Sequence, residues 1–130
     1  MIPTLAPVSH YILIVEDDRP LREALTEALT LEGYDVVAVE NGEVALRHLR
    51  VSTRPCVILL DLMMPVMDGW TFRRAMLGDP ALADIPVVVM TATAAAQRAS
   101  TGADDLVLRK PLHMNAVVDV VQVHCPNGAA

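Results

Sequence analysis

The sequence predicts an α/β domain with a doubly wound, five-stranded parallel sheet between two layers of helices. Five short apolar runs alternate along the chain with segments of helical periodicity, and this alternation is typical of successive βα units. The runs are apolar at nearly every position, as expected of strands that are covered by helices on both faces. Because crossovers between parallel strands are right-handed, few strand orders remain, and 2-1-3-4-5 is a common one.

Two strand–helix units are predicted in the first part of the chain. Tyr11–Val15 is an apolar strand, and the helix after it has Pro20 in its first turn and Gly33 as its stop signal. These are positions where proline and glycine are favoured. Asp35–Val39 is the second strand, and Asn41 with the glycine after it begins a short amphipathic helix.

The third strand leads into the residue on which the functional prediction centres. Val57–Leu60 runs directly into Asp61, so this carboxylate stands at the carboxyl end of a buried strand, where open α/β sheets place their ligand sites. A loop with proline and glycine follows. Asp68 is suited to cap the next helix, which we expect to extend to about Leu77.

The last part of the chain predicts two more strands and two helices. Pro86–Thr91 is the fourth strand, and an alanine-rich helix is expected over about residues 94–102. Leu106–Leu108 is a short fifth strand, and a final helix over about residues 112–123 follows it. The alternation of strands and helices therefore continues to the end of the chain.

Length and composition favour one soluble domain. We assign residues 1–9 to a flexible leader, 10–124 to the domain and 125–130 to a flexible tail. The net charge of −6 and the scattered basic residues argue against nucleic acid as a partner. No apolar run reaches the ~20 residues that a membrane span needs. The first residues also lack the features of a signal peptide, so we expect a cytoplasmic protein.

The two cysteines show no pattern that indicates a metal site or a disulfide framework. Cys56 and Cys125 are far apart in the sequence, and neither lies near a second potential metal ligand at a typical spacing. We therefore predict that both are buried, reduced thiols.

Four of the five predicted strands end in polar residues that are able to bind metal or phosphate. Glu16 and Asp17 follow the first strand, Asp61 follows the third, Thr91 ends the fourth and Lys110 follows the fifth. In a parallel sheet these strand ends share one edge, so their side chains converge in one crevice. Each residue alone is an ordinary turn former, helix cap or solvated charge, and only their convergence indicates a site.

The residue types at this edge indicate magnesium-dependent phosphoryl transfer. Three neighbouring carboxylates repel one another unless a counter-charge is present, and carboxylate oxygens are ligands that Mg²⁺ prefers. Thr91 and Lys110 supply a hydroxyl donor and a positive charge for phosphoryl oxygens. Asp61, which projects alone after its strand, is the candidate nucleophile for an aspartyl-phosphate.

Four motifs resemble the receiver domain of two-component response regulators, and the resemblance covers about residues 10–124. The motifs are Ile-Leu-Ile-Val-Glu16-Asp17-Asp, Asp61-Leu-Met-Met-Pro-Val-Met-Asp68-Gly, Val-Met-Thr91-Ala and Arg-Lys110-Pro. The resemblance implies a flavodoxin-like three-layer sandwich, which agrees with the fold class predicted from the apolar runs.

The resemblance also implies a role for each acidic residue. Asp61 would accept the phosphoryl group. Asp17 and Asp61 would bind Mg²⁺ directly, together with the backbone carbonyl of Met63, and Glu16 would act on the ion through a water molecule. These roles follow from the family and not from the spacing of the residues.

Thr91 and Lys110 would hold the phosphoryl oxygens, and the Lys110–Pro111 peptide bond would be cis. In the family's usual switch, the residue at the position of Thr91 moves toward the phosphoryl group, and an aromatic side chain three residues before the lysine fills the space it leaves. Here that aromatic position is Val107, which is short and stiff at χ1.

Two further departures from the family concern the segment after the fourth strand and the start of the last helix. The segment from Thr91 to Gly102 is about one turn shorter than usual, so we expect a short or irregular fourth helix. Because Val107 cannot act as the aromatic switch, we expect phosphorylation to order or reposition residues 93–101. His113 stands where a smaller capping residue is common, and we interpret it as structural.

The leading interpretation is a stand-alone receiver that accepts a phosphoryl group on Asp61 from a sensor histidine kinase or a phosphotransfer protein. It would contact a downstream protein when phosphorylated and form a weak phosphorylation-dependent dimer. It is a signalling domain and not a dedicated enzyme, although it catalyses its own phosphorylation and dephosphorylation. One alternative is a receiver-like interaction module that works without phosphorylation. The other is an aspartyl-nucleophile phosphohydrolase, which expects an acid/base aspartate where Met63 stands.

Overall fold

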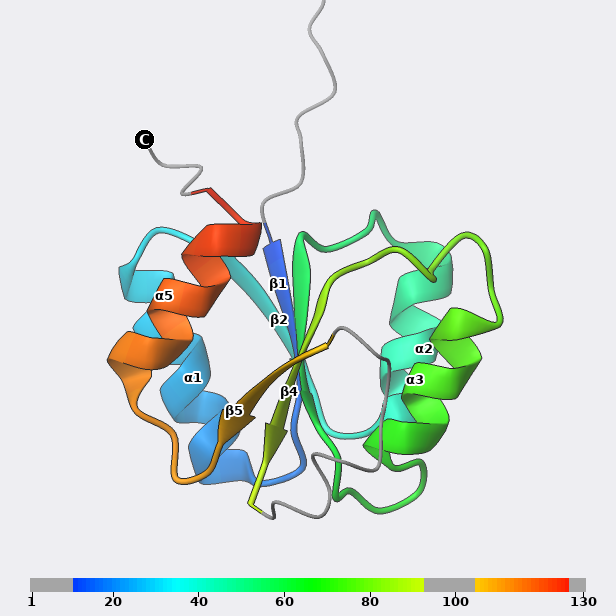
Figure 1. The fold of residues 1–130 in the computed structure, drawn as a ribbon, viewed down its shortest axis with the longest axis horizontal. Coiled ribbons are helices and arrows are strands. Elements are labelled where there is room, and N and C mark those ends of the chain that lie inside the picture. The colour runs from blue at the N-terminus through cyan, green and yellow to red at the C-terminus, as the bar shows by residue number, and fades with distance from the viewer. Residues whose placement is uncertain (1–10, 93–104, 127–130) are drawn as a thin grey trace, which may run out of the picture.

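The computed structural model of the chain describes residues 11–92 and 105–126 (Figure 1). Within these residues the centre is a five-stranded parallel sheet in the order β2-β1-β3-β4-β5, which confirms the predicted fold class and strand order. The strands are β1 (Tyr11–Val15), β2 (Asp35–Val39), β3 (Val57–Asp61), β4 (Val87–Thr91) and β5 (Leu106–Arg109). The helices are α1 (Arg19–Leu31), α2 (Gly42–Val51), α3 (Gly69–Leu77) and α5 (Met114–His124). The predicted fourth helix lies outside the described residues.

Helices cover both faces of the sheet. In Figure 1, α1 and α5 lie on one side of the strands and α2 and α3 lie on the other. Because successive side chains of a strand point to opposite faces, β1 contributes Leu13 and Val15 to the core on the α2/α3 side. The same strand contributes Ile12 and Ile14 to the core on the α1/α5 side. None of the described helices is long and apolar enough to cross a membrane.

Only the central strands are buried along their whole length. Every residue of β1, β3 and β4 is buried, whereas β2 and β5 alternate between partly buried and exposed positions. The cover that we expected on both faces of the sheet is therefore incomplete at the edge strands β2 and β5, because an edge strand has a neighbour on one side only. Asp61 emerges from β3, the strand at the centre of the sheet.

The helices α2 and α3 begin at capping side chains that the sequence indicates. The Asn41 side-chain oxygen accepts a hydrogen bond from the backbone N–H of Val44 at 3.0 Å. Asp68 Oδ1 accepts one from the backbone N–H of Thr71 at 2.8 Å, which confirms the predicted cap of α3. Such caps satisfy N–H groups that have no partner inside the helix. At the end of α1, Gly33 has a φ of 96°, a conformation that glycine adopts readily.

A buried ion pair links α3 to the start of β5. The Arg73 guanidinium donates two hydrogen bonds of 2.8 Å to the Asp105 carboxylate, and both side chains are 7% exposed. A bidentate pair of this kind is among the stronger polar interactions in proteins. The sequence contains no signal for this pair, because its members are 32 residues apart and belong to different elements.

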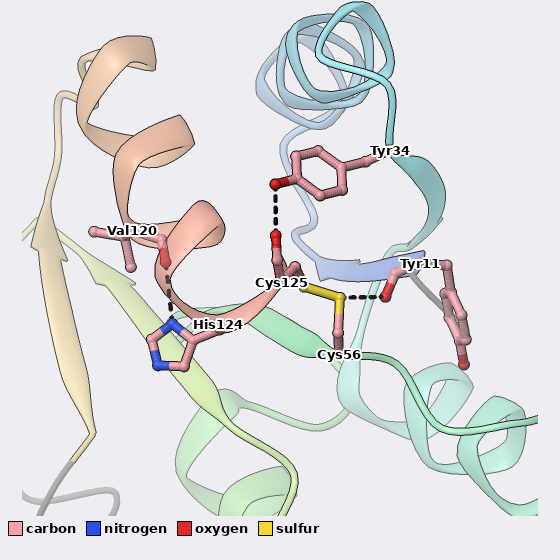
Figure 2. Close-up of a disulfide and its surroundings, with 6 residues drawn as sticks. All are labelled: Tyr11, Tyr34, Cys56, Val120, His124 and Cys125. Atoms are coloured by element: carbon pink, nitrogen blue, oxygen red, sulfur yellow. Dashed lines mark hydrogen bonds between the residues drawn. A yellow bond between two sulfur atoms is a disulfide. The ribbon is translucent and has the colours of Figure 1, made fainter. Parts of the chain in front are cut away.

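The two cysteines form a disulfide, so the prediction of reduced thiols is wrong. Cys56 lies directly before β3 and Cys125 directly after α5, with Cα atoms 5.6 Å apart and a sequence separation of 69 (Figure 2). The pairing follows from the packing of α5 against the sheet, which brings the residue after the helix to the start of β3. No local sequence pattern reports such a distance.

Gly69 places the start of α3 against the end of β3. A Cβ atom at this position would lie 2.5 Å from the carbonyl oxygen of Asp61 and 2.7 Å from the Cα of Leu62. The Gly69 N–H also donates to the Leu62 carbonyl oxygen at 3.0 Å. Only glycine therefore lets α3 begin directly against the end of β3.

We predict that Gly69→Ala lowers the free energy of unfolding by more than about 2 kcal/mol, because the added methyl group forces a backbone shift. Gly78→Ala is the matched control, since a Cβ there would meet its nearest atom at 3.5 Å. That change should be neutral or stabilising by up to about 1 kcal/mol. Urea denaturation measures both changes, and equal effects of the two substitutions would contradict the close approach.

Candidate functional site

The strand register brings the predicted acidic residues together. Val15 of β1 lies opposite Leu60 of β3, so the residues that follow them, Glu16 and Asp61, emerge side by side. Glu16, Asp17 and Asp61 each offer a carboxylate oxygen, and these oxygens lie within 4.8 Å of one another. The predicted convergence of the three carboxylates is therefore present in the structure.

The same register places the other two predicted residues at this edge. Asp61 pairs with Met90 of β4, which Thr91 follows. Thr91 pairs with Arg109 of β5, which Lys110 follows. The Lys110 backbone N–H donates to the Thr91 carbonyl oxygen at 2.8 Å, which extends the pairing of the two strands by one residue.

Lys110 is the counter-charge that connects two of the carboxylates. Its Nζ donates to Glu16 Oε1 at 2.9 Å and lies 3.4 Å from Asp61 Oδ1. The predicted cis peptide bond between Lys110 and Pro111 is present. The ammonium group is therefore directed at the candidate nucleophile from the next-but-one strand of the sheet.

The site residues differ in how far they are buried. Glu16 is fully buried, Asp61 is 3% exposed and Thr91 is 1% exposed, whereas Asp17 is exposed. Burying a carboxylate is unfavourable unless charges and hydrogen bonds compensate. Asp17 is therefore the acidic residue at the mouth of the site, and Glu16 and Asp61 form its floor.

Arg22 in α1 holds the loop that carries two of the carboxylates. Its guanidinium donates to the backbone carbonyl oxygens of Glu16 at 2.8 Å and Asp17 at 3.3 Å. The Asp18 N–H donates to Glu16 Oε2 at 3.1 Å. Sequence patterns alone did not single out Arg22, although an arginine in the first turn of a helix after an acidic loop is a signal that could have done so.

The surroundings of Asp61 raise its pKa from 3.8 to about 7. Burial is the largest cause, and the negative charge of Glu16 adds to it. The Lys110 charge and the Met63 N–H, which donates to Asp61 Oδ1 at 3.3 Å, act in the opposite direction. One lysine does not balance the carboxylates, so the site attracts a proton or another cation.

Lys110 itself stays charged. Burial alone lowers the pKa of its ammonium group, but its hydrogen bond to Glu16 and the charge of Asp61 outweigh burial and leave the pKa above its ordinary value. The ammonium group therefore keeps its full charge at neutral pH, where it faces both buried carboxylates.

The acidic cluster fits a magnesium ion. Mg²⁺ prefers six oxygen ligands at about 2.1 Å, so ligand oxygens lie about 3 Å apart when adjacent and about 4 Å apart when opposite. The three carboxylate oxygens lie within 4.8 Å of one another, which is close to the distances between oxygens around a bound Mg²⁺. The hard oxygen donors and the excess negative charge both favour this ion over softer metals.

The loop between β3 and α3 forms an apolar rim beside Asp61. A cavity of about 380 Å³ is lined by Met63, Met64, Pro65, Asp68 and Trp70. The Met63 side chain is 64% exposed and carries no acid, which disfavours the phosphohydrolase alternative.

In the same loop Val66 has a φ of 69°, and a β-branched residue in the left-handed region is a genuine outlier.

The remaining predictions have mixed outcomes. Val107 is partly buried and packs against the core on the α2/α3 side. His113 is the residue before α5 and makes no side-chain capping hydrogen bond. The expected change in residues 93–101 falls outside the described residues, and the roles of Thr91 and Val107 as a switch stay predictions.

Comparison with known proteins agrees with this geometry. The family model of the response regulator receiver domain matches residues 12–122. The response regulator MprA of Mycolicibacterium vanbaalenii is 38% identical over 113 residues, which cover 82% of this chain and 46% of that protein. The chain thus spans about half the length of this curated relative.

Two solved structures show the same fold. The signal receiver domain of a signal transduction histidine kinase from Syntrophus aciditrophicus is 35% identical and covers 89% of both chains with a TM-score of 0.81. The receiver domain of sensor histidine kinase PA1611 from Pseudomonas aeruginosa, which has a magnesium ion in its active-site cleft, is 26% identical. The match covers 91% of this chain and 98% of that chain, with a TM-score of 0.82.

We predict that Asp61→Asn stabilises the metal-free protein increasingly as pH rises. Because the folded pKa of Asp61 is raised to about 7, the stability linked to its proton is fully present below its unfolded pKa. This stability is lost as pH rises through the pKa that Asp61 has in the folded state. At pH 8 the gain should reach at most about 4 kcal/mol, since one pKa unit is worth about 1.4 kcal/mol.

Urea denaturation of both proteins at pH 5 and pH 8 in the presence of a chelator measures this difference. Asp119→Asn, at an exposed position of α5, is the control. The difference in stability between this variant and the wild type should not grow with pH. A difference between wild type and Asp61→Asn that is the same at both pH values would contradict the raised pKa.

Proposed function

Because the chain belongs to the response regulator receiver domain family, we propose that it accepts a phosphoryl group on Asp61 in a magnesium-dependent reaction. The donor is the phosphohistidine of a sensor histidine kinase or of a phosphotransfer protein. We assign the domain to residues 10–124. Once phosphorylated, it acts through contact with a downstream protein. The reaction takes place in the cytoplasm.

The observation that carries the proposal is a buried nucleophile held beside a fixed cation. Asp61 Oδ1 lies 3.4 Å from Lys110 Nζ at the centre of the carboxyl edge of the sheet. In the transfer, an Asp61 oxygen bonds to phosphorus while the bond from phosphorus to the donor imidazole breaks, and the leaving imidazole takes up a proton. Asp61 must be ionised to attack.

Lys110 and Thr91 receive the phosphoryl oxygens. The ammonium group has three donors, of which one goes to Glu16 Oε1 at 2.9 Å, so it is able to turn toward an incoming phosphoryl oxygen while it keeps a carboxylate partner. The Thr91 hydroxyl is the second donor. Donors fixed in advance stabilise transition-state charge without reorganisation.

The metal ligands in this proposal are Asp17, Asp61 and the Met63 carbonyl, with Glu16 acting through water. Support comes from the three clustered carboxylates and from Asp17, whose exposed carboxylate is open to a hydrated ion. When bound, Mg²⁺ would neutralise charge on the transferring phosphoryl group. Its charge would also lower the pKa of Asp61 and so favour the reactive form.

The apolar rim beside the site is the surface that we assign to the donor protein. Met63 and Val66 are 64% and 77% exposed, and both lie in the loop that follows Asp61. A protein donor has to cover this loop to bring a phosphohistidine to Asp61, and burying exposed apolar side chains favours association. A weak phosphorylation-dependent dimer is part of the same proposal.

We predict that acetyl phosphate, used as a small donor, labels the wild-type chain with one phosphoryl group only when Mg²⁺ is present. Asp61→Asn should abolish labelling because it removes the nucleophile. Asp17→Asn should slow labelling at least about tenfold, since it weakens the metal site. Intact-protein mass spectrometry measures the extent and the rate.

Asp18→Asn is the matched control, because Asp18 is the exposed acid next to Asp17 and is not part of the acidic cluster. It should be labelled at the wild-type rate. Failure to label the wild type, labelling that persists in Asp61→Asn, or labelling that is indifferent to Mg²⁺ would each contradict the proposal.

A further inference from the structure

The Cys56–Cys125 disulfide lies near the amino end of β3, whereas the acidic site lies at the carboxyl ends of the strands. Cys56 directly precedes β3 and Asp61 is the last residue of the same strand, so the bond and the nucleophile stand at its two ends. Cys125 directly follows α5, the helix that comes after Lys110. The disulfide therefore connects the strand that carries the nucleophile with the helix that follows the site lysine (Figure 2).

Each cysteine has a place in the fold that does not require the bond. Cys56 Sγ lies 3.3 Å from the carbonyl oxygen of Tyr11, so a reduced Cys56 thiol has an acceptor for its S–H. Cys125 is fully buried among apolar residues, where a free thiol is well tolerated as a small apolar group. Breaking the disulfide would therefore leave no buried polar group without a partner.

The backbone around Cys125 is also held independently of its sulfur. The Tyr34 hydroxyl donates to the Cys125 carbonyl oxygen at 2.6 Å (Figure 2), and the Cys125 N–H donates to the Val121 carbonyl oxygen at 2.7 Å. The fold thus has a hydrogen bond that retains the end of α5 when the covalent connection is absent. Reduction would loosen this end without releasing it.

The two cysteine residues differ in their exposure to solvent. Cys56 is partly buried, whereas Cys125 is fully buried. Attack by a thiolate is therefore expected at Cys56 Sγ, because access decides which sulfur is attacked. Disulfides in a reducing compartment are usually transient or redox-sensing, and this consideration rests on the cytoplasmic location in the proposed function.

We propose that Cys56 and Cys125 form a reversible thiol–disulfide site, which is a second modification site of this domain. Its co-reactant is a dithiol reductant. One thiolate of the dithiol attacks Cys56 Sγ, the bond between the two cysteine sulfurs breaks, and its electron pair passes to Cys125 Sγ, which takes up a proton. The second thiolate of the reductant then attacks the mixed disulfide, which releases Cys56 as a thiol and leaves the reductant as a disulfide.

The redox state of this site sets how firmly the carboxyl end of α5 is held against the sheet. In the oxidised form, that end is joined covalently to the start of β3. In the reduced form, the connection from Cys125 to the rest of the described fold is the Tyr34 hydrogen bond, together with apolar packing. Phosphorylation of Asp61 is chemically separate, since it takes place at the other end of β3.

The test uses the full chain, kept folded, in mixtures of reduced and oxidised dithiothreitol. Free thiols are alkylated and counted by mass spectrometry. We expect one two-electron transition between zero and two alkylated cysteines that is the same in both directions, with an unchanged circular dichroism spectrum. A chain that keeps two alkylatable thiols under oxidising conditions, or that loses the bond only in denaturant, would overturn the proposal.

Hydrogen exchange tests the effect on α5. Amides of residues 121–125 should exchange at least about fivefold faster in the reduced chain, whereas those of α3 should not change. Tyr34→Phe should enlarge this difference, because it removes the remaining hydrogen bond from the reduced form. Equal exchange of residues 121–125 in both redox states would refute the role of the bond.

Cys56→Ser is the variant that imitates the reduced form, because a serine hydroxyl is able to donate to the Tyr11 carbonyl oxygen. Cys125→Ala is the second variant and places no polar group in the core. Both should show fast exchange in α5 whatever the dithiothreitol ratio. Both should also be labelled by acetyl phosphate at the wild-type rate, so a failure of phosphorylation and a failure of the redox site are separate results.

Discussion

The Lys110 ammonium group is the interaction on which the functional edge of this domain depends. It lies 2.9 Å from Glu16 Oε1 and 3.4 Å from Asp61 Oδ1, and these two carboxylates are almost completely buried. Buried charges are tolerated only when they are paired. One lysine pairs two carboxylates incompletely, and burial, together with the negative charge of Glu16, raises the pKa of Asp61 to about 7. The incomplete pairing also makes the edge attractive to a divalent cation.

The scaffold holds these charges together through the register of a parallel sheet. The charges come from the carboxyl ends of three strands. Asp61 is the last residue of β3, and Glu16 and Lys110 directly follow β1 and β5. Gly69 then lets α3 begin against the end of β3. A site built on strand ends is more rigid than one built on loops. The disulfide fixes the opposite end of β3 to α5.

The strands, the helix caps and the convergence of all five site residues could be predicted because they depend on local patterns combined with one topology. The disulfide and the buried Arg73–Asp105 pair could not be predicted. Their members are 69 and 32 residues apart, respectively, and they meet only because helices pack on the sheet. The partial exposure of β2 and β5 was missed for a related reason. Their valine and leucine residues resemble those of central strands, and only the strand order shows which strands lack a neighbour.

The central claim is that an incompletely balanced carboxylate cluster controls the site, and the titration of Asp61 tests it most directly. Carboxyl carbon-13 NMR of the metal-free chain follows the ionisation of this side chain as pH is changed. We predict a midpoint of about 7 that falls in Glu16→Gln, because the charge of Glu16 opposes ionisation of Asp61. A midpoint near the ordinary value of 3.8 in the metal-free wild type would contradict the account.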